Sequence, residues 1–286
     1  MRLLVTGAGG QLGTDVVRLA ERDGRHEVTA ARHSDLDVGD RDAVMSAVTA
    51  LRPDVIIHAA AWTAVDACES DTDRAWRDNA LACRYVAQAA AMVGSHVVAV
   101  STDYVFDGEL DRPYTEWDRP KPVSSYGRSK LGGEEEIRAA LPGAAVVRTS
   151  WVCGANGSNM VKTILRLGAG EGTLRFVDDQ KGCPTFTEDL AGMLLRFGAG
   201  RLGGLFHVTN QGPTTWFGFA QSVLSAAGLD PARVEPISTQ DLHPPRPAKR
   251  PANSVLDNAA LRLGGFRLLP DYHEPLERTV KTLLAP

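Results

Sequence analysis

Short apolar runs alternate with longer amphipathic stretches through the first half of the chain. Runs rich in Val and Ile, each followed by a stretch of helical period, are typical of βαβ units and a parallel sheet. We therefore predict an α/β fold, a doubly wound parallel sheet of the Rossmann type. The predicted strands are 2–7, 26–32, 54–60, 96–102 and 144–151, and the predicted helices are 12–23, 40–52 with Asp40 as N-cap, 73–94, and one opening near Tyr126.

The pattern is less regular in the second half. Helices are predicted at 158–170 and 215–228, strands at 174–179 and 204–210, and neither at the Pro-rich stretch 243–254. We predict a Rossmann domain at residues 1–150, to which segments around 185–212 return. Residues 151–286 are expected to form mainly a smaller C-terminal lobe that binds the substrate.

Composition narrows the class of protein. The chain has 286 residues, a net charge of −4 and 43% hydrophobic residues, which is typical of a globular protein and favours neither nucleic-acid nor membrane binding. A strand that begins at residue 2 leaves no room for a signal peptide. We expect a cytoplasmic protein, monomer or homodimer. Its cysteines are expected to be reduced packing residues without zinc: Cys68, Cys83, Cys153 and Cys183.

The first strand and first helix are joined by a glycine loop, "VTGAGGQLG", with glycines at residues 7, 10 and 13. Glycine permits a sharp turn and lets the backbone approach a phosphate. The N-terminus of the following helix attracts the negative charge of a pyrophosphate. A tight turn without a ligand is the alternative, but the order of strand, loop and helix favours a dinucleotide site at Gly7, Gly10 and Gly13.

The choice of dinucleotide depends on the end of the second strand. An acidic residue there would bind the ribose 2′-OH of NAD, whereas this chain has Arg32 and His33. A guanidinium suits a 2′-phosphate, so we predict NADPH. An ordinary exposed arginine is the alternative, which leaves NADH open.

Tyr126 and Lys130 are four residues apart and share one face of the predicted helix. A free phenol has a pKa of about 10, too high for acid–base work at neutral pH. We expect the Lys130 ammonium, together with a cationic nicotinamide, to lower the pKa of Tyr126. Lys130 could also hold the nicotinamide ribose. A surface Tyr–Lys pair without a function is the alternative.

A third group stands at the end of the strand 96–102, where ligands bind in a doubly wound sheet. Ser101, Thr102 and Asp103 follow one another there. A hydroxyl at this point can orient a substrate carbonyl. Because successive side chains alternate along a strand, the pattern does not decide between Ser101 and Thr102.

These features together resemble the extended short-chain dehydrogenase/reductase superfamily. Within it, the chain is similar to the dTDP-4-dehydrorhamnose reductase family in ordered blocks that include "STDYVFDG", "SSYGRSKLGGE", "RTSWVCG", "VDDQKGCPT" and "RPANSVLD". The resemblance implies that Thr102 is the active-site hydroxyl, Tyr126 the proton donor and Lys130 its partner. It also implies cofactor contacts by Gln11, Leu12, Asp37, Val38, Ala59, Ala60 and Ala61, and substrate contacts by Thr102, Asp103 and Trp151.

The activity that the resemblance implies is NADPH-dependent reduction of the C4 ketone of dTDP-4-dehydro-L-rhamnose to dTDP-L-rhamnose. Three alternatives stay open. The first is the same reduction on another dTDP-4-keto-deoxysugar of secondary metabolism. The second is an epimerase or 4,6-dehydratase that keeps its NAD bound. The third is a non-catalytic NADP-binding regulatory subunit that resembles the reductase.

Two further sites are suggested. The Pro-rich stretch carries Arg246, Lys249 and Arg250, and basic groups on a stiff loop suit the substrate diphosphate. The resemblance favours Arg250 and Asn253, with a solvated basic loop as the alternative. Some relatives have a magnesium site, to which Asp15 and Glu188 correspond. The C-terminal "TVKTLLAP" has no third acid, so we predict no metal ligand and leave Mg²⁺ uncertain.

Overall fold

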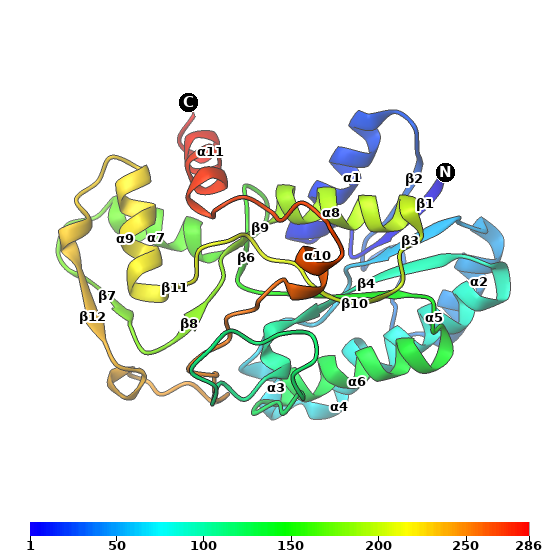
Figure 1. Ribbon diagram of the computed structural model, residues 1–286, viewed down its shortest axis with the longest axis horizontal. Coiled ribbons are helices and arrows are strands. Elements are labelled where there is room, and N and C mark those ends of the chain that lie inside the picture. The colour runs from blue at the N-terminus through cyan, green and yellow to red at the C-terminus, as the bar shows by residue number, and fades with distance from the viewer. Residues whose placement is uncertain (286) are drawn as a thin grey trace.

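In the computed structural model, which describes residues 1–285, six strands form one parallel sheet, most of which can be followed in Figure 1. The strand order is β2-β1-β3-β4-β5-β10, and every neighbouring pair is parallel. This arrangement confirms the predicted doubly wound fold. The strands are β1 (Arg2–Thr6), β2 (Glu27–Ala31), β3 (Val55–His58), β4 (His96–Thr102), β5 (Ala145–Thr149) and β10 (Gly204–His207).

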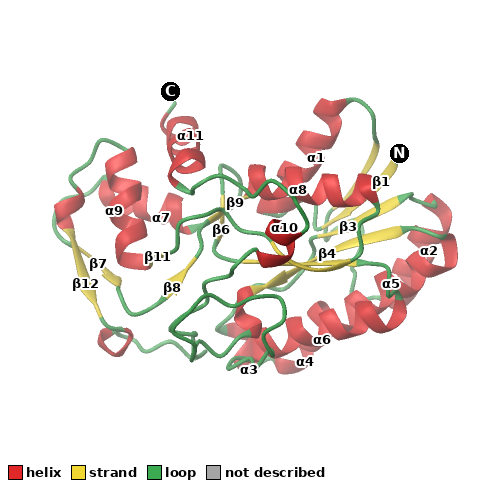
Figure 2. Ribbon diagram, in the orientation of Figure 1, coloured by secondary structure: helices red, strands yellow, loops and turns green. Residues whose placement is uncertain are grey.

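Helices cover both faces of the sheet, which Figure 2 shows as yellow strands between two red layers. One face packs on α1 (Gln11–Asp23) and α8 (Thr187–Gly200). The other packs on α2 (Arg41–Leu51), α5 (Ala82–Val93) and α6 (Ser125–Ala140). β3 and β5 are buried along their whole length, which agrees with the apolar residues at 55–57 and 145–147. The predicted N-cap of α2 is confirmed, since Asp40 accepts hydrogen bonds from the amides of residues 42 and 43.

The helix predicted at 73–94 is interrupted in the structure. It consists of α4 (Thr72–Trp76), a π-helical turn η1 (Arg77–Leu81) and α5, which ends at Gly94. The turn places the fully buried Asn79 against the loop after β3. Asn79 Oδ1 accepts a hydrogen bond from the backbone N–H of Trp62 at 2.8 Å. Asn79 Nδ2 donates to the carbonyl of Trp62 at 3.1 Å and to the hydroxyl of Ser129 at 3.0 Å. The π turn therefore joins that loop to α6.

A smaller lobe lies at the other end of the molecule (Figure 1). It has its own apolar core around α7 (Met160–Gly168), α9 (Trp216–Ala226) and α11 (His273–Leu284). Short two-stranded ladders complete it: β12 (Val234–Ile237) with β7 (Leu174–Val177), β11 (Thr214–Thr215) with β8 (Lys181–Gly182), and β6 (Val152–Cys153) with β9 (Thr185–Phe186). The remaining short helices are α3 (Ala67–Ser70), η2 (Asp103–Val105), η3 (Pro231–Arg233), η4 (Thr239–Asp241) and α10 (Ala259–Leu263).

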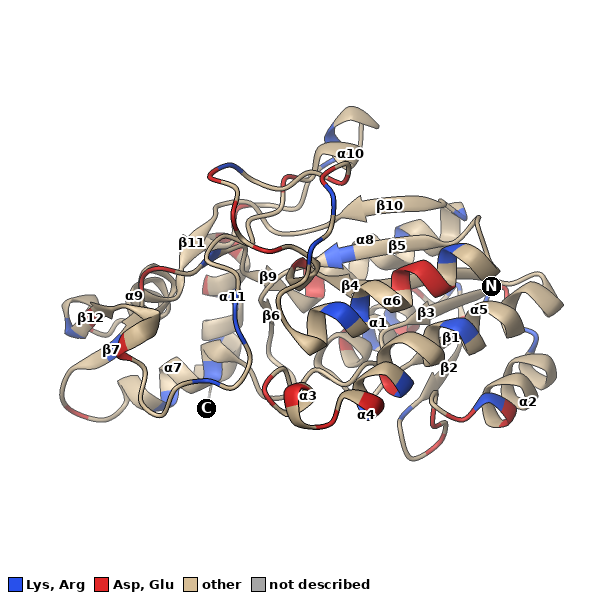
Figure 3. Cartoon of the chain, turned by 90° about the horizontal axis from the view of Figure 1, so that it is seen from below, with Lys and Arg blue, Asp and Glu red and all other residues tan. Residues whose placement is uncertain are grey.

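The chain passes more than once between the main sheet and the smaller lobe. β10 comes from beyond residue 200, yet it pairs with β5 at the edge of the main sheet. The Pro-rich stretch 243–254 has no helix or extended strand, as predicted. Among residues 1–285, no helix has the length and apolar character needed to cross a membrane. Acidic and basic positions are interspersed along the chain (Figure 3).

Candidate active site

The glycine loop makes a tight connection at the carboxyl end of β1. Gly7 has φ +71°, and a Cβ at this position would lie 2.7 Å from Cα of Ala60, just after β3. A Cβ on Gly13 would collide with the carbonyl of Gly7. α1 begins with Gly10 as N-cap and without a side-chain cap, so its first amides are available to an anion. The loop has the shape of a phosphate cradle.

Two cavities flank this loop and share Gly7, Gly10, Ala59 and Ala61. The outer cavity measures about 500 Å³. It brings together the following residues predicted for the cofactor: Gly7, Gly10, Arg32, Asp37, Val38, Ala59, Ala60 and Ala61. The prediction missed Arg74, whose guanidinium lies 4.4 Å over the ring of Trp62 and pairs with Asp78 at 3.2 Å. Nothing in the local pattern distinguishes Arg74 from a solvated helix arginine.

The inner cavity measures about 470 Å³ and lies at the carboxyl ends of β1, β3, β4 and β5. Its lining contains the predicted residues Gly7, Gly10, Gln11, Leu12, Gly13, Ala59, Ala61, Thr102, Asp103, Tyr126, Lys130 and Trp151. It also contains residues that the sequence analysis did not single out for the site, notably Thr63, Val65, Tyr104, Val152 and Trp216. Trp216 belongs to the smaller lobe, and no sequence motif connects it to the glycine loop.

Tyr126 and Lys130 reach this cavity from the first two turns of α6. The helix is capped by Ser124, which accepts from the amide of Gly127 at 3.1 Å. A Cβ on Gly127 would collide with the carbonyl of Tyr104, so this glycine lets α6 approach the end of β4. Both side chains are buried. The Lys130 ammonium donates to the carbonyl of Val100 at 2.8 Å.

Burial dominates the electrostatics of the Tyr126–Lys130 pair. In the protein alone, burial raises the pKa of Tyr126 above its ordinary value, and a hydrogen bond with Thr102 only partly opposes this. Burial also lowers the pKa of Lys130. In the protein alone, desolvation of the phenolate therefore outweighs any lowering of the Tyr126 pKa by Lys130. The lowering expected when a cationic nicotinamide is also bound stays a prediction.

The structure distinguishes the two hydroxyls at the end of β4. Ser101 Oγ donates to Glu134 Oε1 at 2.5 Å, so its hydroxyl is used inside the fold. Thr102 Oγ1 donates to Asp103 Oδ1 at 3.1 Å and accepts from the amide of Tyr104 at 3.2 Å. Burial raises the pKa of Asp103 to about 6, although Ser150 Oγ donates to its carboxylate at 2.8 Å. Thr102, not Ser101, hydrogen-bonds the phenol of Tyr126.

The structure does not bring Arg250 and Asn253 into the inner cavity. The Arg250 guanidinium is bound to both carboxylate oxygens of Asp66, one of them at 2.7 Å. Its side chain is only 8% exposed. The Asn253 amide donates to the carbonyls of Leu110 and Arg112 at 2.8 and 3.0 Å. A role for these two residues in binding the substrate diphosphate stays a prediction, and neither side chain is free in this structure.

Asp15 and Glu188 lie on either side of Arg18, which pairs with them at 3.1 and 3.0 Å. Asp15 also accepts hydrogen bonds from Thr187 and Asn156. Within residues 1–285 there is no group of three His, Cys, Asp or Glu side chains arranged to hold a metal. The structure therefore offers no third protein ligand to accompany these two carboxylates.

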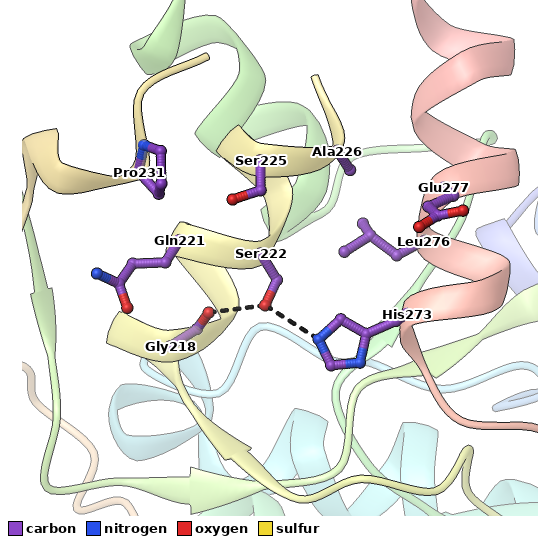
Figure 4. Close-up of a pocket in the computed structure, with 9 residues that line it drawn as sticks. All are labelled: Gly218, Gln221, Ser222, Ser225, Ala226, Pro231, His273, Leu276 and Glu277. Atoms are coloured by element: carbon purple, nitrogen blue, oxygen red, sulfur yellow. Dashed lines mark hydrogen bonds between the residues drawn. The ribbon is translucent and has the colours of Figure 1, made fainter. Parts of the chain in front are cut away.

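A separate cavity of about 450 Å³ lies between α9 and α11 (Figure 4). Ser222 faces His273 there at 3.5 Å, and His273 Nδ1 lies 2.6 Å from Asp271 Oδ1. The order resembles a hydrolase triad. However, Ser222 Oγ is already bonded to the Gly218 carbonyl at 3.0 Å and to Tyr272 Oη at 2.9 Å. We interpret these contacts as packing between the two helices.

The Rossmann sheet, the glycine loop and the buried Tyr126–Lys130 pair beside Thr102 define an NAD(P)-dependent oxidoreductase of the extended short-chain dehydrogenase/reductase type. Sequence comparison agrees with this class. The family model described as "RmlD substrate binding domain" matches residues 1–285. The chain belongs to this family, that of the dTDP-4-dehydrorhamnose reductases, as the resemblance predicted.

Two relatives illustrate the range within the family. A dTDP-4-dehydrorhamnose reductase of Streptomyces griseus is 42% identical, over 99% of this chain and 94% of its own. A probable dTDP-4,6-dihydroxy-2-methyloxan-3-one 4-ketoreductase of Streptomyces antibioticus is 40% identical, over 100% and 96%.

Solved structures of dTDP-4-dehydrorhamnose reductases have nearly the same fold as this chain. A dTDP-4-dehydrorhamnose reductase from Clostridium acetobutylicum, 40% identical, has a TM-score of 0.96 with full coverage of both chains. The Bacillus anthracis enzyme in complex with NADP is 37% identical, with a TM-score of 0.93 over 97% of this chain and 98% of that one.

Proposed function

We propose that this protein reduces the C4 ketone of dTDP-4-dehydro-L-rhamnose to dTDP-L-rhamnose with NADPH. The observation that carries the proposal is the convergence of Thr102, Tyr126 and Lys130 in a cavity that also contains the glycine loop. Family membership adds the substrate class, a dTDP-sugar. Neither the hypothesis of an epimerase or 4,6-dehydratase nor that of a regulatory subunit is supported by relatives of comparable identity.

The residues present fit a dinucleotide. The loop at Gly7 and Gly13 leaves no room for a Cβ, and the uncapped start of α1 suits a pyrophosphate. Arg32 lines the outer cavity beside Gly9, where its guanidinium would meet a 2′-phosphate. A family member has been solved with NADP. These observations support NADPH as the coenzyme.

The chain's own part in the reaction is to hold the ketone and supply a proton. Bound NADPH supplies the hydride that reduces the carbonyl carbon. Because burial raises the pKa of Tyr126, the phenol is protonated at neutral pH and can donate to the ketone oxygen as negative charge develops there. Thr102 hydrogen-bonds the same phenol and favours the phenolate that remains. Lys130, one turn along α6, adds positive charge on the same face.

The test is turnover by the purified protein with dTDP-4-dehydro-L-rhamnose, followed by loss of NADPH absorbance. Tyr126→Phe should lower kcat about 100-fold or more while the dissociation constant of NADPH changes less than about twofold. Tyr85→Phe is the matched control, because Tyr85 lies on α5 outside both cavities. An unchanged rate in Tyr126→Phe would refute the assignment.

The second candidate is the same reduction on another dTDP-4-keto-deoxysugar. The ketoreductase relative of Streptomyces antibioticus, nearly as similar as the rhamnose enzymes, favours keeping it. A panel of dTDP-4-keto-sugars assayed under one condition decides between the two. A higher kcat/KM for a sugar other than the rhamnose precursor would establish the second candidate.

A further inference from the structure

The backbone at Trp151 has an unusual conformation. This residue lies between β5 and β6 and has φ +45°, in the left-handed region that a bulky side chain rarely adopts. Residues held in such conformations occur preferentially at ligand sites, where the surroundings enforce them. Trp151 lines the inner cavity. The contacts around its indole show what enforces the conformation.

One face of the Trp151 ring is covered by Trp216, with ring centroids 3.5 Å apart and planes at 5°. Gly182 is against the same indole. A Cβ on Gly182 would lie nearest to the ring-fusion atom Cε2, then to Nε1 at 2.5 Å and Cζ2 at 2.9 Å. A point in the ring plane outside the indole would be closer to Nε1 or Cζ2 than to the ring-fusion atom Cε2. This Cβ is closer to Cε2, so it lies above the face of the ring. A ring stacked at 3.5 Å leaves no space for backbone on its own side, so Gly182 covers the opposite face.

Gly182 and Trp216 belong to one structural unit of the smaller lobe. β8 and β11 pair with Thr214 opposite Gly182, and Trp216 follows β11 directly as the first residue of α9. Thr215 caps α9 by accepting from the amide of Gly218 at 3.1 Å, and its hydroxyl donates to Asp178 at 2.6 Å. This β8–β11 clamp therefore holds the Trp151 indole from both sides.

Because both faces of Trp151 are covered, it can offer only an edge to a ligand. Trp216 lines the same cavity as Thr102 and Tyr126 and is only partly buried. A sugar whose ketone reaches Tyr126 occupies this cavity, and a 6-deoxysugar carries an apolar methyl group. An indole provides the apolar surface that such a sugar would contact.

We infer that Trp216 is a substrate-contacting residue that determines specificity for the 6-deoxysugar end of the nucleotide sugar. The inference rests on the proposed function and deepens it. Trp151 presents only the edge of its indole to the cavity. The face that contacts the sugar therefore comes from Trp216 at the start of α9, in the smaller lobe. Trp216 is not among the residues for which the resemblance implies a substrate contact.

The experiment compares Trp216→Ala and Trp216→Phe with the unaltered protein at saturating NADPH. Three constants are measured: KM for dTDP-4-dehydro-L-rhamnose, the inhibition constant of dTDP, and KM for NADPH. Trp216→Ala should raise the sugar KM about tenfold, and Trp216→Phe should raise it less. The other two constants should change less than about twofold. Trp117→Ala is the matched control, because Trp117 is 67% exposed and outside the cavity.

An unchanged sugar KM in Trp216→Ala would overturn the inference. A parallel rise in the dTDP inhibition constant would also overturn it, since Trp216 would then contact the nucleotide or only support the fold. Circular dichroism and thermal unfolding of each variant identify a folding defect, and Trp216→Phe, which keeps an aromatic ring, serves when Trp216→Ala does not fold. No turnover by the unaltered protein would instead refute the proposed function, and this inference with it.

Discussion

The guanidinium of Arg148 on β5 donates to both carboxylate oxygens of Glu134 on α6, at 2.8 and 2.7 Å. Both side chains are 2% exposed. Ser101 of β4 donates to the same carboxylate. This pair therefore joins the helix that carries Tyr126 and Lys130 to the two strands whose ends form the inner cavity.

Replacing Glu134 by Gln should destabilise the protein by about 3–5 kcal/mol, because it leaves the Arg148 charge buried without a counter-ion. Urea unfolding measures the change. Glu136→Gln is the matched control on the same helix. Its partner Arg84 is 43% exposed, and such a pair contributes about 1 kcal/mol or less. Equal losses in the two variants would contradict the importance of the buried pair.

The two hydroxyls of β4 should differ in their effect on catalysis. Thr102→Val should lower kcat about 100-fold, because it removes the hydroxyl beside Tyr126. Ser101→Ala should leave kcat within about threefold and reduce stability by about 2 kcal/mol, since its hydrogen bond goes to the buried Glu134 carboxylate. Steady-state kinetics and urea unfolding of both variants check this. A catalytic loss in Ser101→Ala as large as in Thr102→Val would contradict it.

Asp103 should make the stability depend on pH. Its pKa is about 6 in the folded protein, against 3.8 as the ordinary value. Between these values the folded state binds more protons than the unfolded state, so the contribution of Asp103 to stability falls as the pH rises from about 4 to about 6. A rise of the Asp103 pKa to about 6 corresponds to about 3 kcal/mol.

Asp103→Asn removes this ionisation. We expect the variant to gain about 3 kcal/mol relative to the unaltered protein between pH 4 and pH 7, as measured by urea unfolding across that range. The comparison cancels the titration of all other groups. Parallel stability curves for the two proteins would show that Asp103 does not titrate in this window.

Arg32 should determine the preference between coenzymes. Arg32→Ala should raise the KM for NADPH about tenfold, because one exposed charge-assisted hydrogen bond to the 2′-phosphate is lost. The KM for NADH should stay nearly unchanged, because NADH has no 2′-phosphate. Arg41→Ala is the control, because Arg41 is exposed on α2 outside the outer cavity. An equal loss with both coenzymes would place Arg32 elsewhere than at the 2′-phosphate.

Local features of this protein were predictable from the sequence. The strand, glycine loop and helix are consecutive, so their order requires no knowledge of distant segments. The spacing of Tyr126 and Lys130 places both on one helical face, which is a property of the helix alone. The π turn at 77–81 was missed because its cause, the contact of Asn79 with Trp62 and Ser129, lies outside the helix itself.

The sequence by itself determined the doubly wound sheet, the phosphate cradle and the Tyr–Lys pair, because periodicity and short spacing encode them. Only the tertiary structure decided that Ser101 donates its hydrogen bond to Glu134. The same holds for the ion pair of Arg250 with Asp66, 184 residues away, and for the stacking of Trp216 on Trp151. Each of these contacts joins segments far apart in the chain. Their partners are selected by packing and desolvation in the folded state, which no local pattern records.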